Sequence, residues 1–550
     1  MLKKAINTYF LKNKHYLVLF FLIFIGSFLW SLTIIKSGWM YQYGLGFWGA
    51  NGHDGIWHIA LINNLSNLNF SNPVFSGSLI QNYHLGFDLL LSIIHRITLI
   101  PVSILYFQVM PLLFALLIGY LTYVFVSEWT KSKYSALFSV FFVYFGGSAS
   151  WILNKGESAF WSQQAISTLI NPPFALSLVF ILTGLILLQR KKIFLSILLF
   201  GLLIQVKVYA GVLILGGLFV GALYQFFTKQ GFYFLKVFLG SFFISLIIFL
   251  PFNLNPQSLI EWQPFWFLET MMSYSDRIGW QRFYSAMTTY KMGNLLFKEA
   301  TFYGLALLIF VLGNFWTRIL FIKDLFKKLD SFKVMFISII AAGVFIPMLF
   351  VQSGTPWNTI QFLYYSLFFA GLLAGITVSH FGAAVCILIV LMTIPTAYLT
   401  LKDVYIPSRP PAMLSVYEVE ALDFLRNQPS GVVLTYPFDK DKAIEAISNP
   451  PRPLYLYDST AYVSAFSKKP VFLEDEVNLN IMGYDWKSRR KEVELWYKEP
   501  NEEAARKFLS DNNIKYIYWL KPQRALLGES QLGLVKIFEN KVGMIFSVGK

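Results

Sequence analysis

The chain has 550 residues, of which 56% are hydrophobic, 18% aromatic and only 14% charged. A soluble domain carries roughly 25% charged residues, so this composition excludes an ordinary soluble protein and predicts one that crosses a membrane several times. The net charge is +15, yet residues 402–550 hold 21 basic and 20 acidic groups, so the basic excess lies in residues 1–401 and favours loop charges that set orientation over nucleic-acid binding.

The N-terminus carries Lys3, Lys4, Lys12 and Lys14 before an apolar run over 16–35. This run is too long for the core of a signal peptide and no A-x-A-like cleavage site follows it, so we expect an uncleaved first span. A spanning helix needs roughly 20 mostly apolar residues. On this basis about eleven spans are expected: 16–35, 102–126, 134–152, 172–189, 193–209, 211–227, 233–252, 300–321, 333–351, 358–377 and 380–400.

Orientation follows from the basic residues, which are enriched in cytoplasmic loops. With the N-terminus in the cytoplasm, 16 of the 24 Lys and Arg residues before position 402 fall on the cytoplasmic side, and the other eight are spread over much longer loops. We therefore predict a multi-pass protein of the plasma membrane with its N-terminus inside. The loops 36–101 and 253–299 and the whole C-terminal tail would be extracytoplasmic.

The first outer loop contains the stretch GANGHDGIWHIALINNL over 49–65. A turn at Asn51 would place Asp54 in the first turn of a helix, where the helix dipole favours a carboxylate. Asp54 and His58 are four residues apart and would share one helix face. Four apolar residues predict that this helix lies along the membrane surface: Ile56, Ile59, Ala60 and Leu61.

Four of the six histidines belong to this loop: His53, His58, His84 and His95. His84 and Asp88 repeat the spacing of four. An Asp at a helix start is often only a cap, and for Asp88 a capping or packing role is favoured over catalysis. Two His/Asp pairs in a membrane part with only ten acidic residues favour a catalytic role for Asp54. The supporting or second-acid candidates are His53, His58, His84 and Asp88.

The same residues raise the question of a metal. Asp54, His58 and His84 could supply oxygen and nitrogen ligands to a divalent ion. Cys386 is the single cysteine, which excludes an intrachain disulfide and a Cys-based metal site. No cofactor is otherwise indicated.

The second long outer loop, 253–299, alternates aromatic and charged residues. Such aromatics are typical of a belt at the membrane interface, and they equally suit stacking on a sugar, with basic groups binding a lipid phosphate. Lys207, an ionisable residue near the end of a predicted span, either extends its long side chain to the membrane surface, which is favoured, or has a functional role. The resulting candidates for donor phosphate or sugar binding are Lys207, Glu261, Trp262, Asp276, Arg277 and Arg282.

The tail differs in composition from the membrane part. We predict a transmembrane domain over 1–402, a proline-rich linker over 403–413 and a small extracytoplasmic α/β domain over 414–550. Within this domain, the periodicity predicts helices in VYEVEALDFLR and EEAARKFLSDNN. It predicts strands in GVVLTYPF, AYVSAF, PVFL and IKYIYWL.

The layout of a first span, a large outer loop with an early acid, further spans and an outer C-terminal domain resembles the GT-C superfamily of membrane glycosyltransferases. That superfamily includes protein O-mannosyltransferases, oligosaccharyltransferase catalytic subunits and the aminoarabinose transferases of lipid A. The resemblance is strongest over residues 16–126. The stretches AYVSAFSKKPVFLEDE and NNIKYIYWL look like soluble domains at the end of some bacterial members.

The resemblance implies an enzyme that takes a sugar from a polyprenyl-phosphate donor and transfers it, with inversion, to an extracytoplasmic glycan, lipid or protein. Its first-loop acid, which acts as the catalytic base or helps to position it, maps onto Asp54. Many members carry two acids there, whereas this chain has His53 before a single Asp. The family's second acid, on a later loop, has no clear counterpart, and the candidates are Asp88, Glu157, Glu261 and Asp276. Two other classes stay open: a transporter or flippase for lipid-linked saccharides, although the acids avoid span centres, and a catalytically inactive scaffold with the same fold.

Overall fold

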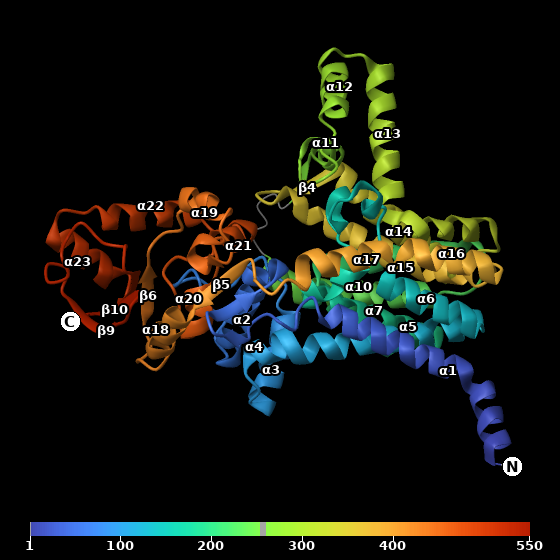
Figure 1. The fold of residues 1–550 in the computed structure, drawn as a ribbon, viewed down its shortest axis with the longest axis horizontal. Coiled ribbons are helices and arrows are strands. Elements are labelled where there is room, and N and C mark those ends of the chain that lie inside the picture. Colours follow the sequence, from blue (N-terminus) through green and yellow to red (C-terminus); the bar gives the residue numbers. More distant parts are fainter. Residues whose placement is uncertain (1, 254–259, 550) are drawn as a thin grey trace. The chain divides into compact units, whose positions relative to one another are not determined.

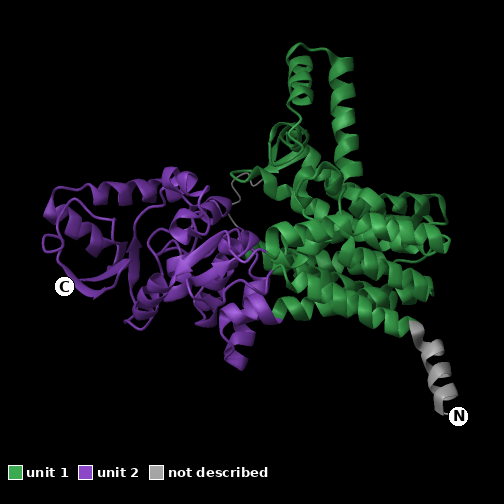
Figure 2. Cartoon of the chain, viewed as in Figure 1, with its two compact units in different colours: residues 1–33, 110–251, 258–406 green, residues 34–109, 252–257, 407–550 purple. Residues whose placement is uncertain are grey.

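The computed structural model of the chain describes residues 2–253 and 260–549, with side chains from His15 onward. It divides into two compact units (Figure 2). Unit 1 comprises residues 1–33, 110–251 and 258–406, and unit 2 comprises 34–109, 252–257 and 407–550. The predicted domains follow chain order, whereas these units group the first outer loop with the tail. The start of the loop 253–299 falls on 254–259, outside the described residues.

Unit 1 is almost entirely helical (Figure 1). Two short strands, β3 (Ile260–Trp262) and β4 (Phe350–Gln352), pair antiparallel. The helices are α1 (Leu2–Ser31), α5 (Met110–Thr130), α6 (Lys133–Phe145), α7 (Pro172–Gln189), α8 (Ile193–Val206), α9 (Val208–Phe227), α10 (Tyr233–Phe249), α11 (Trp266–Ser273), α12 (Gln281–Met292), α13 (Leu296–Phe315), α14 (Ser331–Leu349), α15 (Gln361–Val378), α16 (Ala383–Thr393) and α17 (Pro395–Thr400).

The helices of unit 1 account for the predicted spans. Among the described residues, nine helices are long and apolar enough to cross a membrane, and two shorter apolar helices cover His15–Ser31 and Ile193–Val206. Each of the eleven predicted segments is therefore helical, which confirms a polytopic helical protein. Helices α5, α6, α7, α14 and α15 pack against one another in this unit (Figure 1).

The segment 193–227 forms two helices that meet at Lys207, whose backbone is extended (φ −159°, ψ 114°). The favoured expectation that the Lys207 side chain reaches the surface is wrong, because the residue is buried. Its Nζ lies 3.4 Å from Asn171 Oδ1, so a polar partner inside unit 1 compensates in part for the burial.

Unit 2 combines two four-stranded sheets with surrounding helices. One sheet has the order β1-β2-β5-β7 and the other β6-β8-β10-β9. The strands are β1 (Met40–Tyr41), β2 (Gly44–Phe47), β5 (Ala412–Ser415), β6 (Val432–Thr435), β7 (Arg452–Pro453), β8 (Ile514–Leu520), β9 (Leu534–Glu539) and β10 (Gly543–Val548). The helices are α2 (Asp54–Ser66), α3 (Gly86–Thr98), α4 (Val102–Ile104), α18 (Val416–Arg426), α19 (Lys440–Ala446), α20 (Tyr462–Ser467), α21 (Glu476–Ile481), α22 (Trp486–Tyr497) and α23 (Glu502–Asp511).

The first outer loop and the tail share a sheet in unit 2. Strand β2 of the loop pairs antiparallel with β5 of the tail, with Leu45 opposite Leu414. The carbonyl of Pro407, within the predicted linker, accepts hydrogen bonds from Lys36 Nζ at 2.8 Å and from Trp48 Nε1 at 2.9 Å. The proline-rich stretch is therefore packed against the loop rather than extended through solvent.

Three local predictions in unit 2 are wrong. The stretch PVFL, predicted as a strand, makes only an isolated bridge between Val471 and Val433. The stretch AYVSAF, predicted as a strand, forms helix α20, because the Glu474 carboxylate accepts hydrogen bonds from the backbone N–H groups of Val463 and Ser464 in its first turn. The apolar residues of helix α2, predicted to face a membrane surface, are instead buried in the protein. Every residue over 55–63 is buried, and the helix packs against α3 and α20.

Candidate functional site

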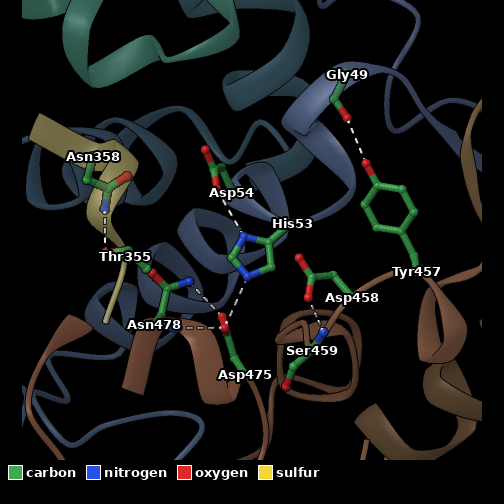
Figure 3. Close-up of polar contacts among 10 residues, drawn as sticks. All are labelled: Gly49, His53, Asp54, Thr355, Asn358, Tyr457, Asp458, Ser459, Asp475 and Asn478. Carbon is green, nitrogen blue, oxygen red and sulfur yellow. Dashed lines mark hydrogen bonds and ion pairs between the residues drawn. The ribbon is translucent and has the colours of Figure 1, made fainter. Parts of the chain in front are cut away.

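His53 lies between two carboxylates in unit 2 (Figure 3). Its Nδ1 is 3.0 Å from Asp54 Oδ1, and its Nε2 is 3.3 Å from Asp475 Oδ1. The chain turns through a short 3-10 helix over 49–52 immediately before His53, which brings the imidazole to the N-terminus of α2. The result is a linear arrangement of acid, imidazole and acid, drawn from the first loop and the tail.

Asp475 is the fixed end of this arrangement. It is fully buried and caps helix α21: Oδ1 accepts a hydrogen bond from the backbone N–H of Asn478 at 3.1 Å, and Oδ2 accepts one from Asn478 Nδ2 at 2.9 Å. Its backbone adopts a left-handed conformation with φ 52°. Because several interactions hold this carboxylate, it provides a rigid partner for His53.

The two carboxylates determine the charge of His53. Burial alone would lower the pKa of the imidazole, but the negative charges and hydrogen bonds of Asp475 and Asp54 together raise that pKa well above 6.5. The imidazolium form is therefore favoured near neutral pH. A positively charged His53 attracts and orients the Asp54 carboxyl group.

Asp54 is the exposed end of the arrangement. Its side chain is 50% exposed, whereas that of His53 is only 12% exposed. It occupies the first turn of α2, where the helix dipole stabilises a carboxylate, although no side-chain cap is formed there. A carboxylate that is accessible on one side and held on the other can accept a proton from a bound substrate.

A third carboxyl group, Asp458, lies beside the same imidazole (Figure 3). Burial raises the pKa of Asp458, the positive charge of His53 opposes this rise, and the charges of Asp475 and Asp54 add to it. Asp458 accepts a hydrogen bond from the backbone N–H of Ser459 at 2.9 Å. The site thus gathers three acids around one histidine.

The other predicted pairs are rearranged. His58 Nδ1 bonds Asp88 Oδ1 at 2.7 Å, across from α2 to α3, so the pairing runs between helices and not along them as the spacing of four suggested. Both residues are buried, and the His58 ring stacks on Tyr106. The His84 ring stacks on Tyr83. These contacts indicate that His58 and Asp88 hold α2 and α3 together.

The residues predicted as a metal site do not fit one. Within residues 2–253 and 260–549, no group of three or more His, Cys, Asp or Glu side chains has the arrangement of a metal site. His58, one of the three predicted ligands, directs its Nδ1 to Asp88 instead.

The six candidates for donor binding belong to unit 1. Arg277 is held within that unit: its Nη1 donates to Ser158 Oγ at 2.8 Å, and its guanidinium lies 4.2 Å from the centre of the Trp161 ring. Asp276 Oδ2 is 3.6 Å from Arg277 Nη2. The other three outer-loop candidates are exposed: Glu261, Trp262 and Arg282.

Lys207 combines with two helix ends. It is the residue immediately before α9, and its Nζ lies near Asn171, which caps α7 by accepting a hydrogen bond from Phe174 N. Helix N-termini carry partial positive charge and free N–H groups. Lys207 also ends α8, whose C-terminus carries partial negative charge, so two of the three helix ends near it favour an anion and one opposes it.

Glu157, an acid that follows the predicted span 134–152, is also buried in unit 1. Burial raises the pKa of its carboxyl to about 7, against hydrogen bonds to Ser167 and to the Gln164 backbone and the charge of Arg318, which lower it. Glu157 Oε2 accepts the hydrogen bond from Gln164 N at 3.2 Å.

Sequence reasoning missed Asp475 and Asp458, because only acids before residue 402 were considered as partners of Asp54. The stretch LEDE over 473–476 was a visible signal, since three consecutive acids are unusual in a segment that also contains apolar residues.

The comparisons with known proteins bear on the fold. No family model matches the chain, and no curated protein matches it. Among solved structures, it is similar to the oligosaccharyltransferase of Archaeoglobus fulgidus tethered with an acceptor peptide, at TM-score 0.51 and 13% identity over 99% of this chain and 75% of that one. It is also similar to the arabinofuranosyltransferase AftD from Mycobacteria, at TM-score 0.53 and 12% identity over 97% of this chain and 40% of that one. The chain therefore has the GT-C fold of these membrane glycosyltransferases.

Proposed function

We propose that this chain is a membrane glycosyltransferase that moves a sugar from a polyprenyl-phosphate donor to a hydroxyl group of an extracytoplasmic glycan, lipid or protein. The observation that carries the proposal is the half-exposed Asp54, held by a buried His53 that is itself held by Asp475. The fold shared with two glycosyltransferases supports the reaction class.

The reaction assigned to Asp54 is general base catalysis. The acceptor hydroxyl gives its proton to the Asp54 carboxylate while its oxygen forms a bond to the anomeric carbon of the donor sugar. The bond between that carbon and the phosphate oxygen breaks, and the lipid phosphate leaves with the electron pair. Attack opposite the leaving group inverts the anomeric configuration.

His53 acts through Asp54 and is a positioning residue. Its two ring nitrogens are both engaged, which fixes the orientation of the imidazole and of the Asp54 carboxylate. Holding a base within about 0.5 Å of its productive position contributes substantially to the rate. Asp475 keeps the imidazole protonated and in place.

Lys207 is our candidate for the donor phosphate. A buried ammonium beside the N-termini of α7 and α9 would bind an anionic group such as the phosphate of the donor.

The experiment is mass spectrometry of lipid-linked sugars and cell-surface glycans from a deletion strain. We expect a polyprenyl-phosphate sugar to accumulate and one surface glycan to lose that sugar, with recovery on re-expression of the wild-type chain. For the Asp54→Asn variant, the matched control is Asp485→Asn. Asp485 also lies at the start of a helix of unit 2, but its carboxylate only caps that helix by accepting a hydrogen bond from Ser488 N. Unchanged lipid and glycan profiles in the deletion strain would contradict the proposal.

A further inference from the structure

Helices α12 and α13 form a hairpin in unit 1. Helix α12 packs against α11 and α13, and the hairpin extends away from the remaining helices of the unit (Figure 1). Helix α13 ends at Phe315, where the backbone of Trp316 turns sharply with φ 44°, and the next segment, 316–326, packs against α15. The apolar stretch that contains the predicted span 300–321 is therefore divided in two, and its second part packs on the helix bundle.

Contacts between the two helices and α11 fix the hairpin. The ring centre of Phe302 on α13 lies 4.9 Å from that of Phe283 on α12. The Glu269 carboxylate of α11 accepts hydrogen bonds from Lys291 Nζ of α12, at 2.8 Å, and from the Tyr303 hydroxyl of α13. One carboxylate thus bonds to both helices and holds them in one orientation, so the hairpin has two defined outer faces.

The outer faces of the two helices differ in polarity. On α13, Leu305, Leu308 and Leu312 follow one another at spacings of three and four, so they share one face, and their side chains are 44% to 52% exposed. On α12, the exposed residues over 281–289 are all polar: Gln281, Arg282, Ser285 and Thr289. The hairpin is therefore amphipathic as a pair of helices, with one apolar helix and one polar helix.

The tip that joins the helices is apolar and basic. Met292, Leu296 and Phe297 are 83%, 76% and 86% exposed. The charged residues over 281–300 are three bases and one acid: Arg282, Lys291, Lys298 and Glu299. Exposed apolar side chains beside a basic excess suit a layer in which acyl chains adjoin anionic headgroups. A second copy of this chain would bring the same positive charge to the contact, which disfavours a dimer here.

We propose that this hairpin lies along one leaflet of the membrane as an arm in the membrane plane. The leucine face of α13 and the tip lie among the acyl chains, and the polar face of α12 lies in the headgroup layer. An interfacial helix buries its apolar face about 5–10 Å deep, and packed helices have axes about 8–10 Å apart, so two adjacent helices can occupy the two layers. This inference concerns lipid contact and does not depend on the proposed reaction.

The test is electron paramagnetic resonance of the full chain in nanodiscs of phosphatidylethanolamine and phosphatidylglycerol. Cys386→Ser removes the single cysteine, and one nitroxide label is then attached at a new cysteine. The α13 sites are Phe297→Cys, Leu305→Cys and Leu312→Cys, and the matched control sites on α12 are Ser285→Cys and Thr289→Cys. We expect each α13 label to be several-fold more accessible to oxygen, which concentrates among acyl chains, than to a water-soluble nickel complex. The α12 labels should show the reverse.

The depths of the labels distinguish an arm in the membrane plane from a helix that crosses the membrane. Because an α-helix rises about 1.5 Å per residue, labels at positions 297 and 312 would differ in depth by about 22 Å if α13 crossed. The proposal predicts similar depths for all three α13 labels.

Thermal unfolding first confirms that each labelled variant is folded. Three results would each overturn the proposal: α13 labels as accessible to the nickel complex as those on α12, a depth that changes steadily along α13, or spin–spin coupling between the α13 labels of two copies, which would assign the leucine face to a dimer. The same accessibilities are expected in the Asp54→Asn background, so failure of the glycosyltransferase proposal leaves this result readable.

Discussion

Asp475 Oδ1 lies 3.3 Å from His53 Nε2, while the other ring nitrogen of His53 lies 3.0 Å from Asp54 Oδ1. The first carboxylate is fully buried and the last is half exposed, so one imidazole joins the interior of unit 2 to its surface. This relationship makes Asp475, which lies far along the chain from Asp54, part of the same site.

Replacing Asp475 by Asn should lower kcat without unfolding the protein. Asn keeps the volume but removes the charge that raises the pKa of His53, so that the pKa falls and the Asp54 carboxylate is held less firmly. The loss of the ion pair between Asp475 and His53, at 3.3 Å, predicts a decrease of roughly tenfold to a hundredfold. The pH profile of transfer should shift as well. An unchanged kcat with an unchanged profile would show that Asp475 is only a helix cap.

Replacing Asp88 by Asn should instead reduce stability. Asp88 is fully buried and bonds His58 at 2.7 Å, so its removal leaves a buried imidazole without its charged partner. Weakening a buried hydrogen bond to a charged group destabilises a protein by roughly 1 to 3 kcal/mol. Thermal unfolding in detergent measures the effect, and activity per folded molecule should stay near that of wild type. A normal melting temperature with lost activity would assign Asp88 to catalysis.

The Glu157→Gln variant should be more stable than wild type at alkaline pH. The folded-state pKa of Glu157, about 7, is raised above the ordinary value of 4.5, so the folded state binds this proton more tightly than the unfolded state. The protonated Glu157 carboxyl therefore stabilises the folded state fully below about pH 4.5. This stabilisation, up to roughly 3 kcal/mol, is lost as the pH rises through 7. The melting temperatures of the two proteins should diverge between about pH 5 and pH 8.5. A constant difference over that interval would contradict the assignment.

Replacing Lys207 by Met should raise the KM for the donor more than it lowers kcat. Met preserves the length and apolar body of the side chain but removes the ammonium group that we assign to the donor phosphate. A charge-assisted hydrogen bond contributes about 1.5 to 3 kcal/mol, which predicts a change in KM of roughly tenfold to a hundredfold. Lys192→Met, at the residue before α8, is the control. Equal KM values for both variants would remove Lys207 from the donor site.

The spans could be predicted from sequence because a long apolar run in lipid must satisfy its backbone hydrogen bonds internally, which a helix does within one segment. Helix α18 was also predicted. Its capping box joins Ser415 and Glu418, which are only three residues apart, so this signal is local in the sequence. Helix α20 was not predicted, because Glu474 caps it from outside the helix. The pairing of β2 with β5 was likewise hidden, since no local pattern links the first loop to the tail.

The candidate site was predictable only in its local part. His53 and Asp54 are neighbours in sequence, so their proximity follows from the chain itself. The partnership of His58 with Asp88 depends on how α2 packs against α3, and helical spacing alone suggested different pairs. Asp475 enters the site through tertiary packing, which periodicity does not encode.

The most direct test of the central claim is sugar transfer by purified Asp54→Asn with a polyprenyl-phosphate sugar, identified by mass spectrometry. Asn keeps the size and capping ability of the side chain but cannot accept the proton of the acceptor hydroxyl. We predict loss of transfer by at least about a hundredfold, with a wild-type melting temperature and with Asp485→Asn fully active. Undiminished transfer by folded Asp54→Asn would contradict the assignment of Asp54 as the catalytic base.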